Sequence, residues 1–223
     1  MSCRQMGLLL PCLLFATQLA AQADPRVPSA PPPTYPQTAS GVGPIPAPFP
    51  GSAFAQRHLS RASADLQKAY ALEHTAGADQ ARIHSLYRDA RESLDAALVH
   101  VHGDPAMHAE VYNTVAYVET RLGRPQEALG AADKALRLAP TLTKALENRG
   151  EALVELRQTE EAKQVYLTLF PQHRELASVL LAYMQNWIDT QRKTTETPQG
   201  LLDAFQEWVH TRAQIAASGA DGA

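Results

Sequence analysis

A pattern that occurs twice in succession, between Ala109 and Gln172, constrains the fold of this chain more than any other feature. Each copy spans about 34 residues and places apolar residues at steps of three and four, the spacing of one face of a helix. Small residues recur within that spacing and allow two helices to approach closely. A helical hairpin of this kind buries its apolar face by stacking on its neighbours. The pattern therefore predicts an all-α chain built from successive hairpins.

Residues at matching positions of the two copies resemble those of the tetratricopeptide-repeat (TPR) family. The first copy begins at Ala109 and matches the family with Tyr112, Ala116, Ala128, Ala132, Ala135 and Pro140. The second begins at Thr143 and matches with Leu146, Gly150, Ala162 and Tyr166. Three residues depart from the family pattern: Glu119 stands where a large aromatic residue is usual, Leu169 replaces an alanine, and Pro171 comes early.

Two apolar stripes with helical spacing precede the repeats, and two follow them. The first pair contains Leu59, Ala62, Leu66, Ala69 and Tyr70, then Ile83, Tyr87, Ala90, Leu94, Ala97 and Val101. The second pair contains Leu176, Leu180, Tyr183, Met184, Trp187 and Ile188, then Leu202, Phe205, Val209, Ala213 and Ala216. A stack of hairpins exposes apolar surface at its ends unless other helices cover it. The resemblance implies a TPR-like helical-hairpin solenoid, a right-handed superhelix, with degenerate capping helices at both ends.

The resulting organisation has seven parts. They are a signal peptide (1–23), a proline-rich disordered linker (24–51), a degenerate helical hairpin (52–104), a first repeat (105–142), a second repeat (143–175), C-terminal capping helices (176–217) and a disordered tail (218–223). An alternative to capping is that Trp187 or Trp208 forms part of a partner groove or a dimer face.

The first residues have the order of a secretory signal. Arg4 precedes an apolar run from Met6 to Leu14, and Ala21-Gln22-Ala23 follows as a cleavage site. A membrane anchor fits less well, because Pro11 interrupts the run and a span needs about 20 apolar residues. We therefore expect cleavage near Ala23 and an exported product, periplasmic or secreted, with no stable membrane span. A lipid-attached Cys12 is disfavoured, because Pro11 is not the small residue that such a site needs.

The segment after the signal is rich in proline. It contains ten prolines between Asp24 and Gly51, and proline prevents helices and sheets from propagating. The favoured interpretation is an extended spacer, and the alternative is a ligand for an aromatic-lined groove. Both cysteines, Cys3 and Cys12, precede this segment, so the mature chain would have no disulfide and no thiolate metal site.

Charge and motifs argue against two functional classes. The formal net charge is −3, and the chain has no basic patch, which disfavours nucleic acid as a partner. No nucleophile elbow, zinc-protease motif, phosphate-binding loop or dinucleotide glycine pattern occurs. The sequence therefore predicts a protein that is not an enzyme and that needs no cofactor.

One histidine cluster leaves a second functional class open. His100, His102 and His108 occur in HVHGDPAMH, and Asp104 could complete a metal site. Metal binding needs converging ligands with supporting contacts, so ordinary surface histidines are the favoured interpretation and no metal site is predicted. The alternative is a metal- or small-molecule-binding periplasmic accessory protein.

The TPR resemblance also suggests where a partner would bind. In that family the first helix of each hairpin lines the concave side of the stack. The predicted partner-binding residues on these helices are Asn113, Tyr117, Arg121, Lys144, Asn148 and Glu151. Their polar groups suit an extended peptide or its carboxylate, and a partner helix in the groove is equally compatible. The predicted function is a non-catalytic adaptor in a bacterial cell envelope, whose partner belongs to the envelope, secretion or cell-wall machinery. Partner identity and oligomeric state stay open.

Overall fold

The computed structural model describes residues 50–75, 77–101, 103–194 and 197–218. These residues form eight α-helices and no strand, so the fold is all-α as predicted. The helices are α2 (Pro50–Glu73), α3 (Gln80–His100), α4 (Pro105–Arg121), α5 (Pro125–Leu138), α6 (Thr143–Glu155), α7 (Thr159–Leu169), α8 (Arg174–Gln191) and α9 (Gln199–Ser218). The predicted signal peptide and residues 24–49 of the predicted linker lie outside the described residues, as do residues 219–223 of the predicted tail.

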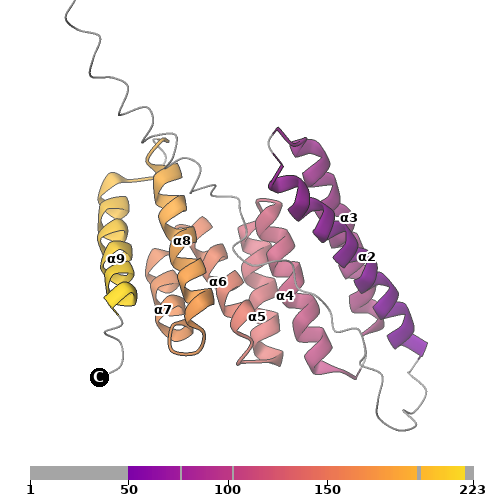
Figure 1. The fold of residues 1–223 in the computed structure, drawn as a ribbon. Coiled ribbons are helices and arrows are strands. Elements are labelled where there is room, and N and C mark those ends of the chain that lie inside the picture. The colour runs from indigo at the N-terminus through magenta and orange to yellow at the C-terminus, as the bar shows by residue number, and fades with distance from the viewer. Residues whose placement is uncertain (1–49, 76, 102, 195–196, 219–223) are drawn as a thin grey trace, which may run out of the picture.

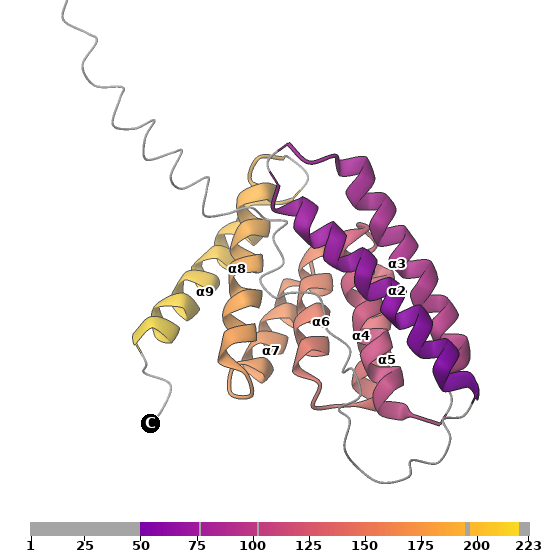
Figure 2. The same ribbon diagram turned by 45° about the vertical axis from the view of Figure 1, so that its right-hand side comes forward.

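Consecutive helices pack as antiparallel pairs. The pairs are α2 with α3, α4 with α5, α6 with α7, and α8 with α9. Further contacts join α3 to α4 and α5 to α6, and α6 also packs against both α4 and α8. The pairs follow one another across the molecule, from α2 and α3 at one end to α9 at the other (Figures 1 and 2). The first helices of the last three pairs, α4, α6 and α8, therefore lie next to one another in that order.

The helices begin where local chemistry favours a start. Asp79 and Asp104 accept hydrogen bonds from the first backbone amides of α3 and α4. Pro125 occupies the first turn of α5, where its missing N–H costs no hydrogen bond. Helix α2 begins at Pro50, two residues before the predicted start.

The turns inside the two central hairpins have the same backbone geometry. Gly123 and Arg157, which are 34 residues apart, both have a positive φ, of 71° and 61°. The hydrogen bond from the Gly123 amide to the Thr120 carbonyl, at 3.0 Å, has its counterpart from Arg157 to Val154, at 2.9 Å. Only glycine adopts this conformation without strain, so the surrounding packing must hold Arg157 in it.

Apolar side chains form two clusters. The first joins α2, α3 and α4 and reaches Ala131 and Ala132 of α5. The second joins α6, α7, α8 and α9, with Leu129 and Leu136 of α5 packed against it. Among the described helices, α5 alone contributes to both clusters. The predicted stripe residues of α2 and α3 are buried except Tyr70, which is half-buried, and Leu202, Phe205 and Val209 of α9 are buried too.

Glu119, which stands where TPR units usually have an aromatic residue, forms an ion pair between two helices. Its buried carboxylate accepts a hydrogen bond from Arg91 Nε at 2.5 Å and lies 3.5 Å from Arg124 Nη1. Arg91 comes from α3, so an ion pair joins α3 to α4 at the position where the family usually has an aromatic ring.

None of the helices in the described part of the chain is both long enough and apolar enough to cross a membrane.

Candidate functional site

A cavity of about 580 Å³ opens among six helices. Its walls come from the end of α2, the first turns of α3, the α4–α5 turn, α6 and α8. The lining residues are Glu73, Gln80, Ile83, His84, Tyr87, Thr120, Arg121, Leu122, Gly123, Pro125, Glu155 and Tyr183. Both apolar clusters therefore contribute helices to this cavity.

A pair of tyrosines connects α3 to α4 at the cavity. The Tyr87 hydroxyl donates to Glu73 Oε1 at 2.8 Å and lies 3.5 Å from the Tyr117 hydroxyl. Their rings meet edge to face, with centroids 6.2 Å apart. Burial raises the pKa of both tyrosines, so both hydroxyls keep their protons. Each can donate one hydrogen bond and also accept one.

Arg121 lies between this tyrosine pair and α6. Its guanidinium carbon is 5.1 Å from the centre of the Tyr117 ring, and its Nη2 is 4.0 Å from Glu151 Oε2. Burial lowers the pKa of Arg121, but the Glu151 carboxylate and the nearby tyrosines raise it more, so the side chain stays charged. Arg121 thus brings a fixed positive charge to a buried position.

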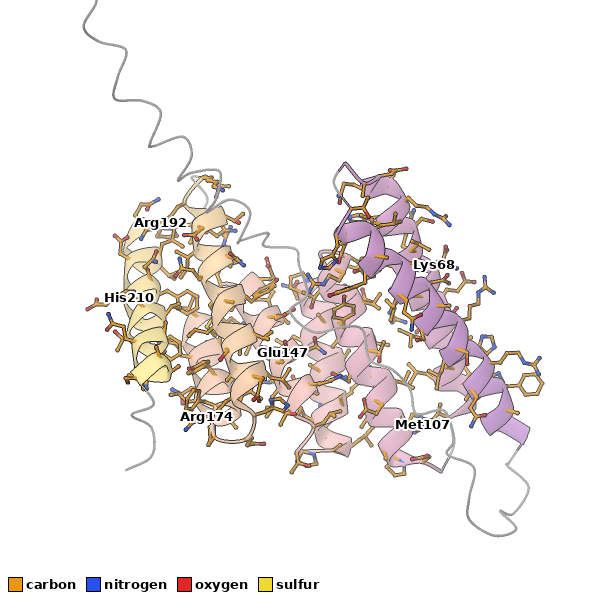
Figure 3. All side chains as sticks on the ribbon, viewed as in Figure 1. Lys68, Met107, Glu147, Arg174, Arg192 and His210 are labelled. Carbon is orange, nitrogen blue, oxygen red and sulfur yellow. The ribbon has the colours of Figure 1, made fainter. Side chains whose placement is uncertain are left out.

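Three glutamates follow one another at successive turns of α6. Burial raises the pKa of Glu147 to about 8, and the negative charge of Glu151 adds to the rise. Burial also raises the pKa of Glu151, although Arg121 opposes the shift. Figure 3 shows Glu147 near the middle of the molecule, away from the labelled Lys68 and Arg192.

Glu155, the third of these glutamates, is exposed and lines the cavity. Its Oε1 accepts a hydrogen bond from the Tyr183 hydroxyl of α8 at 2.6 Å. Burial is the largest cause that raises the pKa of Tyr183, and Glu151 and Glu155 add to it. The cavity thus has a tyrosine-bonded carboxylate on α2, at Glu73, and another on α6.

The structure brings three of the six predicted site residues together. Arg121 lines the cavity, and Tyr117 and Glu151 are its buried neighbours. Two others bind each other: Asn148 Nδ2 donates to Asn113 Oδ1 at 2.8 Å and to the Asn113 carbonyl oxygen at 3.2 Å. This buried amide pair holds α6 against α4.

The sixth residue, Lys144, lies half-buried near the start of α6 and does not line the cavity. Its positive charge lowers the pKa of Glu147, against the larger effect of burial.

Glu73, Tyr87 and Tyr183 belong to the site but were not predicted as site residues. Tyr87 and Tyr183 were assigned to apolar stripes because of their spacing. The signal that could have identified them is the hydroxyl, since a tyrosine in a buried stripe needs a hydrogen-bond partner. Glu73, at the end of α2, carried no comparable signal.

His100 and His108 of HVHGDPAMH lie on different helices. His100, at the end of α3, packs against the rings of Phe54 and His58, whereas His108, on α4, stacks on Tyr112. His102 lies outside the described residues. Across the described ranges, no three potential metal ligands come together.

Comparison with known proteins adds no assignment: no protein-family profile matches the sequence, and no curated protein matches it either.

Proposed function

We propose that this protein is an exported, non-catalytic adaptor that holds a segment of a partner protein in the cavity among α2, α3, α4, α5, α6 and α8. The observation that carries the proposal is the cavity of about 580 Å³, whose walls come from successive hairpins. A groove of this kind suits an extended segment, because each helix offers side chains at a regular interval. The proposed setting is the bacterial cell envelope, as the leader-like sequence of residues 1–23 suggests.

A TPR-like solenoid is the architecture that we propose for the stack. The contacts of α6 with α4 and α8 support it, because first helices of successive hairpins are neighbours in such a superhelix. The small residues at matching positions support it too, since Ala116, Ala128 and Ala162 are completely buried. The equivalent turns at Gly123 and Arg157 give a third, independent support. The right-handed superhelix and the capping role of the outer helices belong to the same proposal.

The chemistry of the cavity indicates what kind of segment it would hold. A segment that enters meets Glu73 from α2 and Glu155 from α6, with the Arg121 guanidinium close by. Polar side chains with donor groups, such as amides, lysine or arginine, complement the two carboxylates. Backbone carbonyl groups of the same segment can accept from Arg121.

Photocrosslinking from inside the cavity tests this proposal. A photoreactive amino acid replaces His84, which is exposed and lines the cavity, in a host that exports the full chain. The matched control replaces His210, which is exposed on α9 and outside the cavity lining. We expect a discrete crosslinked protein from position 84 that is absent from position 210.

A charge-reversing variant sharpens the test. Glu155→Arg in the position-84 background should reduce the crosslinked product at least several-fold, because it replaces a carboxylate of the cavity by a positive charge. Glu155 is exposed, and circular dichroism checks that the loss of its bond to Tyr183 leaves the helices intact. Identical products from positions 84 and 210, or an unchanged yield in Glu155→Arg, would rule out this cavity as the partner site.

A further inference from the structure

A second pocket lies near the other end of the helix stack. It has a volume of about 370 Å³ and is formed by the last turns of α7, the α7–α8 turn, and α9. Its apolar lining comes from Leu167, Pro171 and Ile215, and Leu167 is 38% exposed. None of its lining residues belongs to the cavity described above.

Aromatic rings form a continuous row beside this pocket. The ring centroids of Phe170 and Tyr166 are 5.6 Å apart, and those of Tyr166 and Trp208 are 5.4 Å apart. An arginine lies at each end of the row. The guanidinium carbon of Arg174 is 5.1 Å from the Phe170 centroid, and that of Arg212 is 5.5 Å from the Trp208 centroid. Both arginines line the pocket, so two cations are held at the edge of an apolar depression.

Among the described residues, no ion pair neutralises the two arginines of this pocket. The ion pairs of the described residues include neither Arg174 nor Arg212. The Nε of Arg212 is buried without a hydrogen-bond acceptor. Arg174 is the first residue of α8, where the helix dipole is already positive. The side chain of Glu175, the acidic residue next to Arg174 in sequence, is 85% exposed and forms no ion pair with Arg174.

We propose that this pocket binds a partner protein through a hydrophobic side chain that lies next to a carboxylate, such as a C-terminal leucine. The apolar residues receive the side chain, and the guanidinium groups bind the carboxylate through charge-assisted hydrogen bonds. The small volume suits one side chain with its adjoining backbone. A long acyl chain would need apolar walls on all sides, whereas Leu167, Pro171 and Arg174 are exposed to solvent.

A matched pair of small probes tests the proposal on the full chain. N-acetylleucine carries the side chain and the carboxylate, and N-acetylleucinamide carries the same side chain without the charge. We expect N-acetylleucine to shift the backbone NMR signals of residues 166–174 and 208–215, with an affinity at least tenfold higher than that of the amide. Equal affinities, or shifts confined to other helices, would overturn the proposal.

Three variants identify the groups responsible. Arg174→Gln with Arg212→Gln should weaken N-acetylleucine binding at least tenfold, and Leu167→Ser should weaken it separately by removing apolar contact. Arg88→Gln, an exposed arginine on α3, is the control and should bind normally. Because none of these side chains belongs to the buried core, each variant should keep the helical circular dichroism of the parent. Unchanged binding in the double arginine variant would contradict the assignment.

Two further arms exclude other occupants. If octanoate displaced N-acetylleucine with tenfold higher affinity, the pocket would be a lipid-anion site, and the proposal would be wrong. If the same signals shifted with protein concentration alone, a second copy of the chain would be the occupant, with the same consequence. Partner capture in the first cavity is read by crosslinking from His84, so the two sites can fail independently.

Discussion

Glu147 carries a carboxyl group whose protonation is coupled to folding. Its pKa is raised from 4.5 to about 8, chiefly by burial, and the Glu151 charge on the same helix adds to this. The positive charges of Lys144 and Arg121 lower this pKa, but by less than burial raises it. Near neutral pH the folded chain therefore keeps a proton that the unfolded chain has lost.

This difference predicts how stability depends on pH. Between about pH 4.5 and pH 8 the folded state binds more protons at Glu147 than the unfolded state, so the free energy of unfolding falls as pH rises. The slope from one such group is at most about 1.4 kcal/mol per pH unit. Glu147→Gln cannot ionise, so its stability should fall less steeply. Urea unfolding of both proteins from pH 5 to pH 9 measures the two slopes.

The control for this prediction is Glu161→Gln, on the exposed face of α7. It should keep the pH dependence of the parent chain. Parallel curves for Glu147→Gln and the parent would show that the carboxyl of Glu147 is not the coupled group. A residual slope in Glu147→Gln is expected, because burial raises the pKa of Glu151 in the same direction.

The sequence predicted some residues of the site correctly and others not. The repeat spacing led to Tyr117, Arg121 and Glu151, which do lie together. It also led to Asn113 and Asn148, which bind each other across two helices, because spacing alone cannot show which polar groups pair within the chain. The raised pKa of Glu147 depends on tertiary burial, and no local pattern reveals that.

At the scale of single helices, two glycines distinguish close packing from open surface. A Cβ added at Gly150 of α6 would lie 2.6 Å from Leu180 Cδ2 of α8, and Leu180 is completely buried. A Cβ added at Gly130 of α5 would meet nothing within 4 Å. The first glycine is required for the approach of α6 to α8, whereas the second only makes its helix more flexible.

We predict opposite effects of alanine at these two positions. Gly150→Ala should destabilise the chain by about 1–3 kcal/mol through overpacking. Gly130→Ala should stabilise it by about 0.5–1 kcal/mol, because alanine loses less backbone entropy in a helix. Urea unfolding followed by circular dichroism measures both changes. If Gly150→Ala matched or exceeded the stability of the parent, the close contact of α6 with α8 would be refuted.

The helices themselves were largely predictable. The stripes of α2 and α3 and the proline start of α5 follow from spacing and capping chemistry. The turn at Arg157 was harder to predict, because an arginine gives no signal for a positive φ. The sequence indicates this turn only through the repeat, because Gly123 lies at the equivalent position 34 residues earlier.

At the scale of the whole molecule, two apolar clusters share one helix. Helix α5 contributes small residues to the first cluster and packs Leu129 and Leu136 on the second. Polar contacts supplement this link: Asn113 with Asn148, and Asp133 with Arg149, whose Nε is 2.9 Å from the Asp133 carboxylate. Cooperative unfolding of the two clusters therefore depends on the contacts between α4, α5 and α6.

Asn148→Ala should weaken that cooperativity. The change leaves the buried Asn113 side-chain oxygen without its donor, at a cost of about 1–3 kcal/mol. Both tryptophans of the chain, Trp187 and Trp208, belong to or pack on the second cluster, so their fluorescence reports on that half alone. We expect coincident fluorescence and circular dichroism transitions in the parent and separated midpoints in the variant. Midpoints that stay together in Asn148→Ala would show that α5 alone is sufficient to couple the clusters.

The position of α5 between the clusters also has a mechanical consequence. A pull on the two ends of the helix stack passes in series through each hairpin. At α5 and α6 that load is carried by Leu129 and Leu136 together with the polar pairs Asn113–Asn148 and Asp133–Arg149. The two clusters would then respond to the pull as two blocks that are joined at α4, α5 and α6. Because the first cavity takes walls from both blocks, a segment bound there would add a further connection between them.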